Sequence, residues 1–440
     1  MRGWRYNAAL GAEIEEYVSP LFDVVSARQR EALYQNPLNS IHLSVPRGAD
    51  AADAAAAATR CLAEWQQTGV LTQDALPGIY VYYQYFRLPG SAREYCRKGF
   101  MCHIRATDWA EGQVLRHENT LPAAVSDRAG LLAATQLQSS ATHGLYRDEE
   151  FELEPFLDEA IQNPLYQTEE DYQGARDVLA VIQDAAVIRR FQALLAARPV
   201  ILADGHHRYE GSLAYRQARE RAAAAGGDGA GPTGREPWNY HLMYLTNAAA
   251  DDLRILPTHR LLLELPGHLS DDELLARLAP WFTLRPLDEP HDLPELLAGK
   301  RWAFGLLLAG QTFKLRLRPE VHEQLAWDTT PQVKDLDLTV LHYFVFERAL
   351  GLGDLNAQRH WPGVAYVRSF SECVQRVGSG AARAAFITNE VSMAEVEAVC
   401  ASGAVMPAKS TFFYPKTIGG FLFTSIADTE APLPEGVFLP

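Results

Sequence analysis

The sequence has few cysteines, no long apolar run and no excess of basic residues. Only five of its 440 residues are cysteine. They are not spaced like metal-ligand pairs, so we expect reduced thiols in a cytoplasmic protein. No apolar run is long enough to span a bilayer, and the first residues lead into no apolar signal core. The formal net charge of −15 argues against a general binder of nucleic acid or anionic membranes, because both reward an excess of lysine and arginine.

Common catalytic motifs are absent as well. The chain has no Gly-x-x-x-x-Gly-Lys-Ser/Thr phosphate loop and no His-Glu-x-x-His zinc pair. No serine occupies a Gly-x-Ser-x-Gly elbow, which disfavours a serine hydrolase. Chemistry in this protein therefore depends on a site of another design.

Periodicity and turn residues predict alternating helices and strands. Ser26 is a plausible N-cap for the first helix. The predicted helices cover 26–33, 51–65, 126–135, 172–197, 269–282, 291–298, 333–350 and 393–400. The predicted strands cover 40–45, 78–86, 99–105, 200–203, 240–246, 302–308, 312–317 and 384–388. We expect residues 147–175 to be acidic and solvated, and 221–234 to form a flexible surface excursion.

The densest group of ionisable residues follows the strand predicted at 200–203. Asp204 and Gly205 end that strand with turn chemistry, His206, His207 and Arg208 follow, and helix-forming composition begins at Tyr209. A corner between a strand and a helix directs free backbone N–H groups at one point, which suits an anion such as phosphate. Arg208 would add a planar fork for phosphate oxygens. A structural turn with buried histidines is the alternative, but clustered ionisable groups favour function.

Three weaker clusters lie elsewhere in the chain. The segment at 409–416 combines Lys409 and Lys416 with the hydroxyls of Ser410 and Thr411, so it is a second candidate phosphate contact or a basic strand that caps a sheet. In 116–120, Glu118 is a candidate base or metal ligand beside His117, or part of a loop that caps a helix. His259 and Arg260 end a strand and are the weakest candidates for substrate binding.

The stretch Asp204-Gly-His-His-Arg-Tyr-Glu-Gly211 resembles the phosphate-binding box of the ParB/sulfiredoxin superfamily. Gly205, Arg208 and Gly211 match the Gly-x-x-Arg-x-x-small pattern in register. The free serine kinases of that superfamily carry a similar Asp-Gly-His-His-Arg run. His206 stands where sulfiredoxin has its cysteine, which argues against sulfinic-acid repair. The acidic charge and the lack of a helix-turn-helix signal argue against DNA partitioning.

Over nearly its whole length the chain also resembles an uncharacterised bacterial and archaeal family. The shared marks are spread from the N-terminal to the C-terminal part of the chain. They are Ser-Pro-x-Phe-Asp at 19–23, His-Glu-x-Thr at 117–120, Asp127-Arg128, Ala-Asp-Gly-His-His-Arg-Tyr-Glu at 203–210, Pro-Thr-His-Arg at 257–260 and Met-Pro-x-Lys-Ser-Thr-x-Phe-x-Pro-Lys at 406–416. Membership of that family does not name a reaction.

These resemblances imply a mixed α+β fold in which a mixed sheet with helices contains a ParB/sulfiredoxin-like nucleotide-binding unit. We predict an N-terminal α+β region at 1–195, a phosphate-binding core at 196–265, an α+β insertion or second domain at 266–350, and a C-terminal segment at 351–440 that closes the site. A length of 440 residues is too great for one ordinary core. The sequence leaves a homodimer open.

The function predicted from the motif is a cytoplasmic small-molecule kinase of serine metabolism, which uses ATP, ADP or pyrophosphate and Mg²⁺. Asp204 would hold the metal, while His206 and His207 would assist catalysis. Glu118 or Asp23 would accept the proton of the acceptor hydroxyl. By resemblance to the free serine kinases, serine is the leading acceptor. A small-metabolite phosphatase with His207 as acid or nucleophile, and a non-catalytic nucleotide sensor, remain alternatives.

Overall fold

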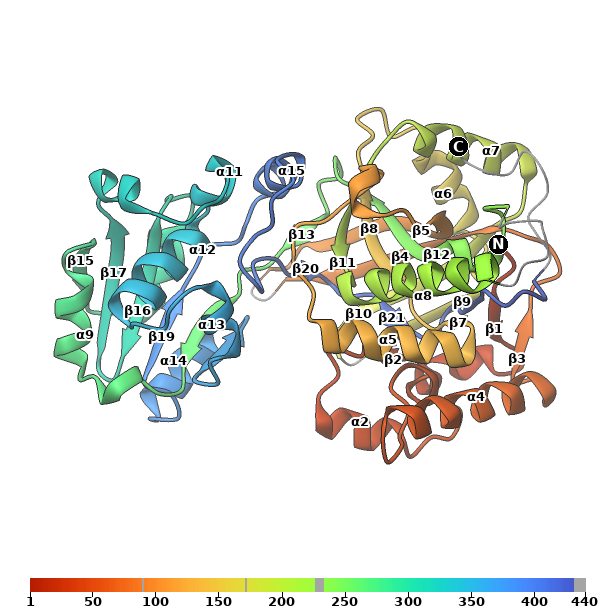
Figure 1. Ribbon diagram of the computed structural model, residues 1–440, viewed down its shortest axis with the longest axis horizontal. Coiled ribbons are helices and arrows are strands. Elements are labelled where there is room, and N and C mark those ends of the chain that lie inside the picture. Colours follow the sequence, from red (N-terminus) through yellow and green to blue (C-terminus); the bar gives the residue numbers. More distant parts are fainter. Residues whose placement is uncertain (89–90, 171, 226–232, 431–440) are drawn as a thin grey trace. The chain divides into compact units, whose positions relative to one another are not determined.

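The chain divides into two compact units (Figure 1). The computed structural model describes residues 1–88, 91–170, 172–225 and 233–430. Unit 1 comprises Met1–Arg116, Thr120–Leu253 and the described residues from Pro415 onward, and unit 2 comprises His117–Asn119 and Arg254–Tyr414. These limits differ from the four domains predicted from the sequence. Whether those four ranges fold as separate units stays a prediction.

Unit 1 is built on an eight-stranded mixed sheet, so the predicted α+β class is confirmed. From edge to edge its strands are β6 (Val114–Leu115), β11 (Val200–Asp204), β8 (Thr142–Tyr146), β12 (Tyr240–Asn247), β5 (Glu94–Arg105), β4 (Ile79–Arg87), β10 (Ala175–Ile182) and β9 (Tyr166–Glu170). Only the neighbours β11–β6 and β12–β8 are parallel. The site strand β11 lies near one edge of the sheet, between β6 and β8.

Helices cover this sheet, and alternate strand residues enter two separate cores. Tyr80 and Tyr82 of β4 pack in one core with Trp65, whereas Val81 packs in the other with Phe191. This period of two is the geometry that a strand buried on both faces requires. The helices of unit 1 are α1 (Ile14–Tyr17), α2 (Ala27–Leu33), α3 (Ile41–Ser44), α4 (Ala51–Gln67), α5 (Pro122–Thr135), α6 (Glu154–Ala160), α7 (Ala185–Ala196) and α8 (His206–Ala225).

Three short ladders join distant parts of the chain within unit 1. They pair β1 (Trp4–Tyr6) with β3 (Leu71–Gln73), β2 (Ser19–Pro20) with β21 (Ile418–Gly419), and β7 (Leu137–Gln138) with β22 (Thr424–Ser425). The second ladder holds the Ser-Pro-Leu-Phe-Asp turn beside the segment that follows Lys416.

Unit 2 contains a fully antiparallel six-stranded sheet. Its strand order is β15 (Phe282–Leu287), β17 (Gln311–Leu317), β16 (Ala303–Leu308), β19 (Ala384–Ile387), β14 (His259–Leu262) and β18 (Val364–Val367). A separate ladder pairs β13 (Arg254–Ile255) with β20 (Phe413–Tyr414). The helices are α9 (Asp271–Leu278), α10 (Leu293–Leu297), α11 (Pro331–Lys334), α12 (Asp337–Val340), α13 (Leu355–His360), α14 (Phe370–Gly378) and α15 (Met393–Ala401).

Most of the elements predicted from periodicity form close to their expected positions. Ser26 caps α2 through a capping box with Gln29, as its position predicts. The helix predicted at 51–65 is α4, and the strands predicted at 78–86, 240–246 and 302–308 are β4, β12 and β16. None of the helices in the described ranges is both long and apolar enough to cross a membrane.

Two predicted elements are wrong. Residues 40–45 form the short helix α3 rather than a strand, because Asn39 accepts a hydrogen bond from the Ile41 N–H and anchors the turn to the Glu16 and Val18 carbonyls. Residues 172–197 are not helical throughout. Their first half is strand β10, which pairs with β4 on one side and β9 on the other, so sheet hydrogen bonding overrides local composition.

Two further predictions fail in part. The helix predicted at 333–350 is broken into α11, α12 and a π-helix at Leu341–Ala349. The acidic segment 147–175 is not simply solvated, since Asp148 is buried and Leu157 enters a core. Most of the excursion predicted at 221–234 lies outside the described residues.

Candidate functional site

The corner between β11 and α8 depends on one glycine. Gly205 has a φ of +88°, and a Cβ atom placed there would lie 2.7 Å from the Cγ2 atom of Thr142 and 2.8 Å from a terminal nitrogen of Arg208. Side chains rarely adopt this backbone conformation, and here they would also collide. Helix α8 starts at His206, three residues before the helical composition indicates. The two histidines and Arg208 therefore form its first turn.

Asp204 lies between two cations at this corner. A terminal nitrogen of Arg208 is 3.1 Å from Oδ2, and the Lys416 ammonium bonds Oδ1. Only 13% of the Asp204 side chain is exposed, with 8% for Arg208 and 10% for Lys416. Although burial by itself raises the pKa of the Asp204 carboxyl, Lys416 and Arg208 hold it well below its usual value. Asp204 is therefore a carboxylate at neutral pH, and the trio has one more positive than negative charge.

Lys416 is held in place by its backbone. Its N–H donates to the Gln173 side-chain oxygen at 2.6 Å, and its carbonyl accepts from the Gln84 side chain at 3.0 Å. Arg97 donates to the preceding carbonyl, that of Pro415, at 2.5 Å. Sequence reasoning missed Arg97, because no local pattern marks a basic residue in the middle of strand β5.

Arg97 is a third cation near the corner. It is 2% exposed, and its Nε and one terminal nitrogen have no hydrogen-bond partner among the described residues. The ion pairs in the described part of the chain do not include one for Arg97. A buried guanidinium with unused donors is costly unless an anion or water completes it.

The histidines near the corner are buried or hydrogen-bonded. His207 accepts a hydrogen bond from the Leu121 N–H at its Nε2, with a separation of 3.0 Å. His206 is buried. His143, which sequence reasoning missed, pairs with Asp204 across the sheet. Burial first, and then the charge of Arg97, lower the pKa of His143 well below its usual value.

A second link connects two motifs within unit 1. The Thr120 hydroxyl, from the His-Glu-x-Thr mark, donates to the Glu210 carboxylate of α8 at 2.6 Å. Thr120 and Glu210, one residue from each mark, are therefore neighbours within unit 1.

Unit 2 gathers most of the remaining predicted residues around 406–411. The His117 Nε2 lies 2.8 Å from the Thr411 hydroxyl, and the Met406 N–H donates to the His117 carbonyl at 2.8 Å. The Lys409 N–H points at the Glu118 carboxylate at 3.4 Å. Lys409 has a φ of +58°, a strained conformation for a lysine. Glu118 and Lys409 are therefore neighbours within unit 2.

Arg260 and Ser410 support the backbone of this cluster. Arg260 is fully buried, and its guanidinium donates to the Thr258 and Lys409 carbonyls. Burial lowers the pKa of Arg260 to about 10. The Ser410 hydroxyl donates to the Pro407 carbonyl at 2.6 Å.

His259 is a buried neighbour of Arg260. Burial, with a smaller contribution from Arg260, lowers the pKa of His259 to about 4, and its Nδ1 accepts the Thr388 N–H at 3.2 Å. The contacts of Arg260, Ser410 and His259 are structural, so their predicted ligand roles stay predictions.

The predicted site residues thus divide between the two units. Those on unit 2 are His117, Glu118, His259, Arg260, Lys409, Ser410 and Thr411, and those on unit 1 are Asp23, Asp204, Gly205, His206, His207, Arg208 and Lys416. Asp23 is exposed. The motif at 406–416 is itself divided, because the chain passes from unit 2 to unit 1 after Tyr414.

The residues at the corner do not fit the predicted magnesium role. Both carboxylate oxygens of Asp204 already bond cations, which would repel a metal ion. Among the described residues no group of three or more His, Cys, Asp or Glu side chains is arranged to hold a metal.

Comparison with known proteins gives one family match. A family model described as "Protein of unknown function (DUF1015)" matches residues 1–339. No curated protein sequence matches the chain.

Several solved structures resemble the chain distantly. A conserved hypothetical protein from Pyrococcus furiosus aligns with a TM-score of 0.36 and 11% identity, over 74% of this chain and 95% of its own. A free serine kinase in complex with AMP aligns with a TM-score of 0.36 and 12% identity, over 74% of this chain and 90% of its own. SbnI from Staphylococcus aureus, truncated at its C-terminus, aligns with a TM-score of 0.31 and 9% identity, over 72% of this chain and 85% of its own. Likeness at this level carries no weight for function.

Proposed function

This chain belongs to the DUF1015 family of proteins of unknown function, and we propose that it is a small-molecule phosphotransferase. It would move phosphate from a nucleotide or polyphosphate donor to a hydroxyl of a small metabolite. One observation carries the proposal: two buried cations, Arg208 and Lys416, share the single carboxylate of Asp204 at the first turn of a 20-residue helix.

The charge balance of this corner favours an anionic ligand. Buried charges are stable when they are paired, and the trio of Asp204, Arg208 and Lys416 has one positive charge in excess. Arg97 adds another buried cation with unused donors. The first backbone N–H groups of α8 and its dipole favour negative charge at the same place. Phosphate oxygens would complete all of these groups.

Phosphoryl transfer needs positioning and charge neutralisation more than covalent help from the protein. In the proposed reaction the acceptor oxygen attacks the terminal phosphorus, and the bond to the leaving phosphate of the donor breaks. Arg208 and Lys416 would neutralise the charge that develops. The proton of the acceptor hydroxyl would pass to a carboxylate, for which Glu118 and Asp23 are the candidates.

The phosphatase alternative is less well supported. It requires His207 as acid or nucleophile, but the Nε2 of His207 already accepts the Leu121 N–H. A nucleotide sensor would use the same anion site as a kinase, but it would bind the nucleotide without consuming it.

The test is a transfer assay combined with donor binding. ATP, ADP and pyrophosphate are each incubated with serine, with and without Mg²⁺, and phosphorylated product is measured. Arg208→Ala and Lys416→Met should each weaken donor binding at least tenfold. Arg221→Gln, an exposed residue of the same helix, is the matched control and should bind as the wild type does.

The outcomes separate the three functions. Product that appears only with an acceptor supports a kinase, and phosphate release without one supports a phosphatase. Tight binding without turnover supports a sensor. Donor binding that survives Arg208→Ala unchanged contradicts the proposed site. Glu118→Gln and Asp23→Asn then identify the base, because only its loss should lower turnover while donor affinity is kept.

A further inference from the structure

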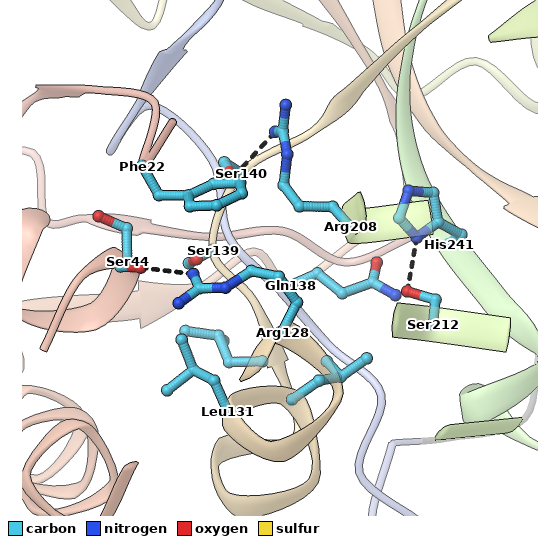
Figure 2. A pocket seen from close by; sticks show the side chains of 12 residues that line it. Phe22, Ser44, Arg128, Leu131, Gln138, Ser139, Ser140, Arg208, Ser212 and His241 are labelled. Carbon is cyan, nitrogen blue, oxygen red and sulfur yellow. Dashed lines mark hydrogen bonds between the residues drawn. The ribbon is translucent and has the colours of Figure 1, made fainter. Parts of the chain in front are cut away.

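Three sequence marks that lie far apart meet at one pocket of unit 1. Phe22 comes from the Ser-Pro-Leu-Phe-Asp turn, Arg128 from the Asp-Arg pair of α5, and Arg208 from the first turn of α8. Figure 2 shows their side chains around a common space, together with serines from the connection between β7 and β8. The pocket is small and partly open to solvent, which suits a small molecule rather than a macromolecule.

The wall of the pocket holds two guanidinium groups. Its lining includes Arg128 and Arg208 and, in the described part of the chain, no acidic side chain. Arg128 is well fixed: it donates to the Ser44 carbonyl at 2.8 Å and to Asp127 at 2.6 Å, and its guanidinium lies 4.5 Å from the centre of the Phe22 ring. Gly211 lets α8 approach this residue, since a Cβ there would lie 3.1 Å from that of Arg128.

Buried polar atoms at two places in the wall lack a partner. The Ser44 hydroxyl and the Nε of Arg208 make no hydrogen bond to any described residue, although both side chains line the pocket and are less than one-tenth exposed. Such groups are rare in native proteins and call for a ligand or an ordered water. The floor is apolar, formed by Leu131, Leu132 and Leu137.

We propose that this pocket binds a small organic carboxylate. Its hydrocarbon part would lie on the leucines and the Phe22 ring, and its charge would be balanced by Arg128 and Arg208. Most N–H groups of both guanidiniums are already committed to protein acceptors, so few donors remain. A monoanion with two oxygens matches that supply better than a phosphate dianion with three.

The pocket adjoins the proposed phosphate site through a single side chain. One terminal nitrogen of Arg208 donates to the Ser140 hydroxyl in the pocket wall at 3.1 Å, and the other bonds Asp204. Arg208 therefore contacts both the pocket wall and Asp204. Binding of a carboxylate in this pocket does not require the protein to transfer phosphate.

The test compares carboxylates with their uncharged amides on the full chain. Butyrate and benzoate, against butyramide and benzamide, are measured by thermal shift and titration calorimetry. Each acid should bind at least tenfold more tightly than its amide. Arg128→Gln should remove that preference, whereas Arg60→Gln, exposed on α4, should keep it. Leu131→Trp, which fills the floor, should abolish binding of acids and amides alike.

Equal affinity for acid and amide would overturn the proposal, and so would unchanged butyrate binding in both Arg128→Gln and Leu131→Trp. Inorganic phosphate that binds this pocket in place of butyrate, with loss in Arg128→Gln, would also overturn it. Lys416→Met should bind butyrate normally. If the protein binds butyrate but transfers no phosphate, the carboxylate site is supported and the phosphotransferase function is contradicted.

Discussion

The Lys416 ammonium donates a hydrogen bond to the Asp204 carboxylate, although the two residues lie 212 positions apart. This contact joins the last motif of the chain to the end of strand β11. It also separates Lys416 from Lys409 of the same motif, which lies in unit 2 with Glu118. The ion pair therefore defines which part of that motif belongs to the phosphate corner.

Replacing Lys416 with methionine should destabilise unit 1. The change leaves one oxygen of a buried carboxylate without its cation, which costs about 1–3 kcal/mol, while Arg208 still pairs with the other oxygen. Urea unfolding measures the effect as a lower midpoint. Lys300→Met, at an exposed position, is the control and should unfold at the wild-type midpoint. Equal urea midpoints for Lys416→Met and Lys300→Met would mean that the Lys416–Asp204 ion pair contributes nothing to the free energy of unfolding.

Stability should depend on pH through Asp204. Its pKa in the folded protein is lowered, so the unfolded chain takes up a proton at a higher pH. The contribution of ionised Asp204 to the free energy of unfolding is complete above pH 3.8, the ordinary pKa of this carboxyl. It is lost as the pH falls below that value. The difference in unfolding free energy between the wild type and Asp204→Asn should therefore shrink as the pH drops from 6 to 3. A difference that stays constant over this range would contradict the shift.

Gly205→Ala should be far more harmful than an alanine at another glycine of positive φ. At Gly205 the new methyl group would be strained and would also collide with Thr142 and Arg208. At Gly112, with a φ of +70°, it would meet nothing within 4 Å. We expect Gly112→Ala to cost about 1 kcal/mol of backbone strain, and Gly205→Ala to cost more and to lose donor binding. Comparable urea midpoints would show that the corner can adjust.

Unit 2 should contain a carboxyl that opposes stability at high pH. Burial, partly offset by a hydrogen bond from the Trp302 N–H, raises the pKa of Asp337 to about 6. A raised pKa gives stability that is complete below the ordinary value of 3.8 and is lost as the pH rises through 6. Asp337→Asn keeps an oxygen for Trp302, so it should be more stable than the wild type by about 3 kcal/mol at pH 8.

At pH 4 the wild type and Asp337→Asn should unfold alike. Asp335→Asn, whose side chain is 52% exposed, serves as the control and should show no gain between pH 4 and pH 8. A gain at pH 8 in the control but none in Asp337→Asn would reverse the assignment.

The elements that sequence patterns predict well are those set by neighbouring residues. Ser26 and Gln29 form their capping box within one turn, and the apolar run before Asp204 shows the strand pattern in its own residues. The helix expected at 172–197 failed in its first half because β10 pairs with β4, whose residues lie outside any local window of the sequence.

The sequence by itself indicated the corner: a strand that ends at Asp204 and Gly205, three ionisable residues after it, and a helix that follows. Only the tertiary structure decided its partners. Lys416, Arg97 and Arg128 lie at least 76 positions from Asp204 in the sequence. They meet around the corner because of the strand order and the packing of α5 on α8. Ion pairs and cavities depend on such distances in space, which a pattern of neighbouring residues does not contain.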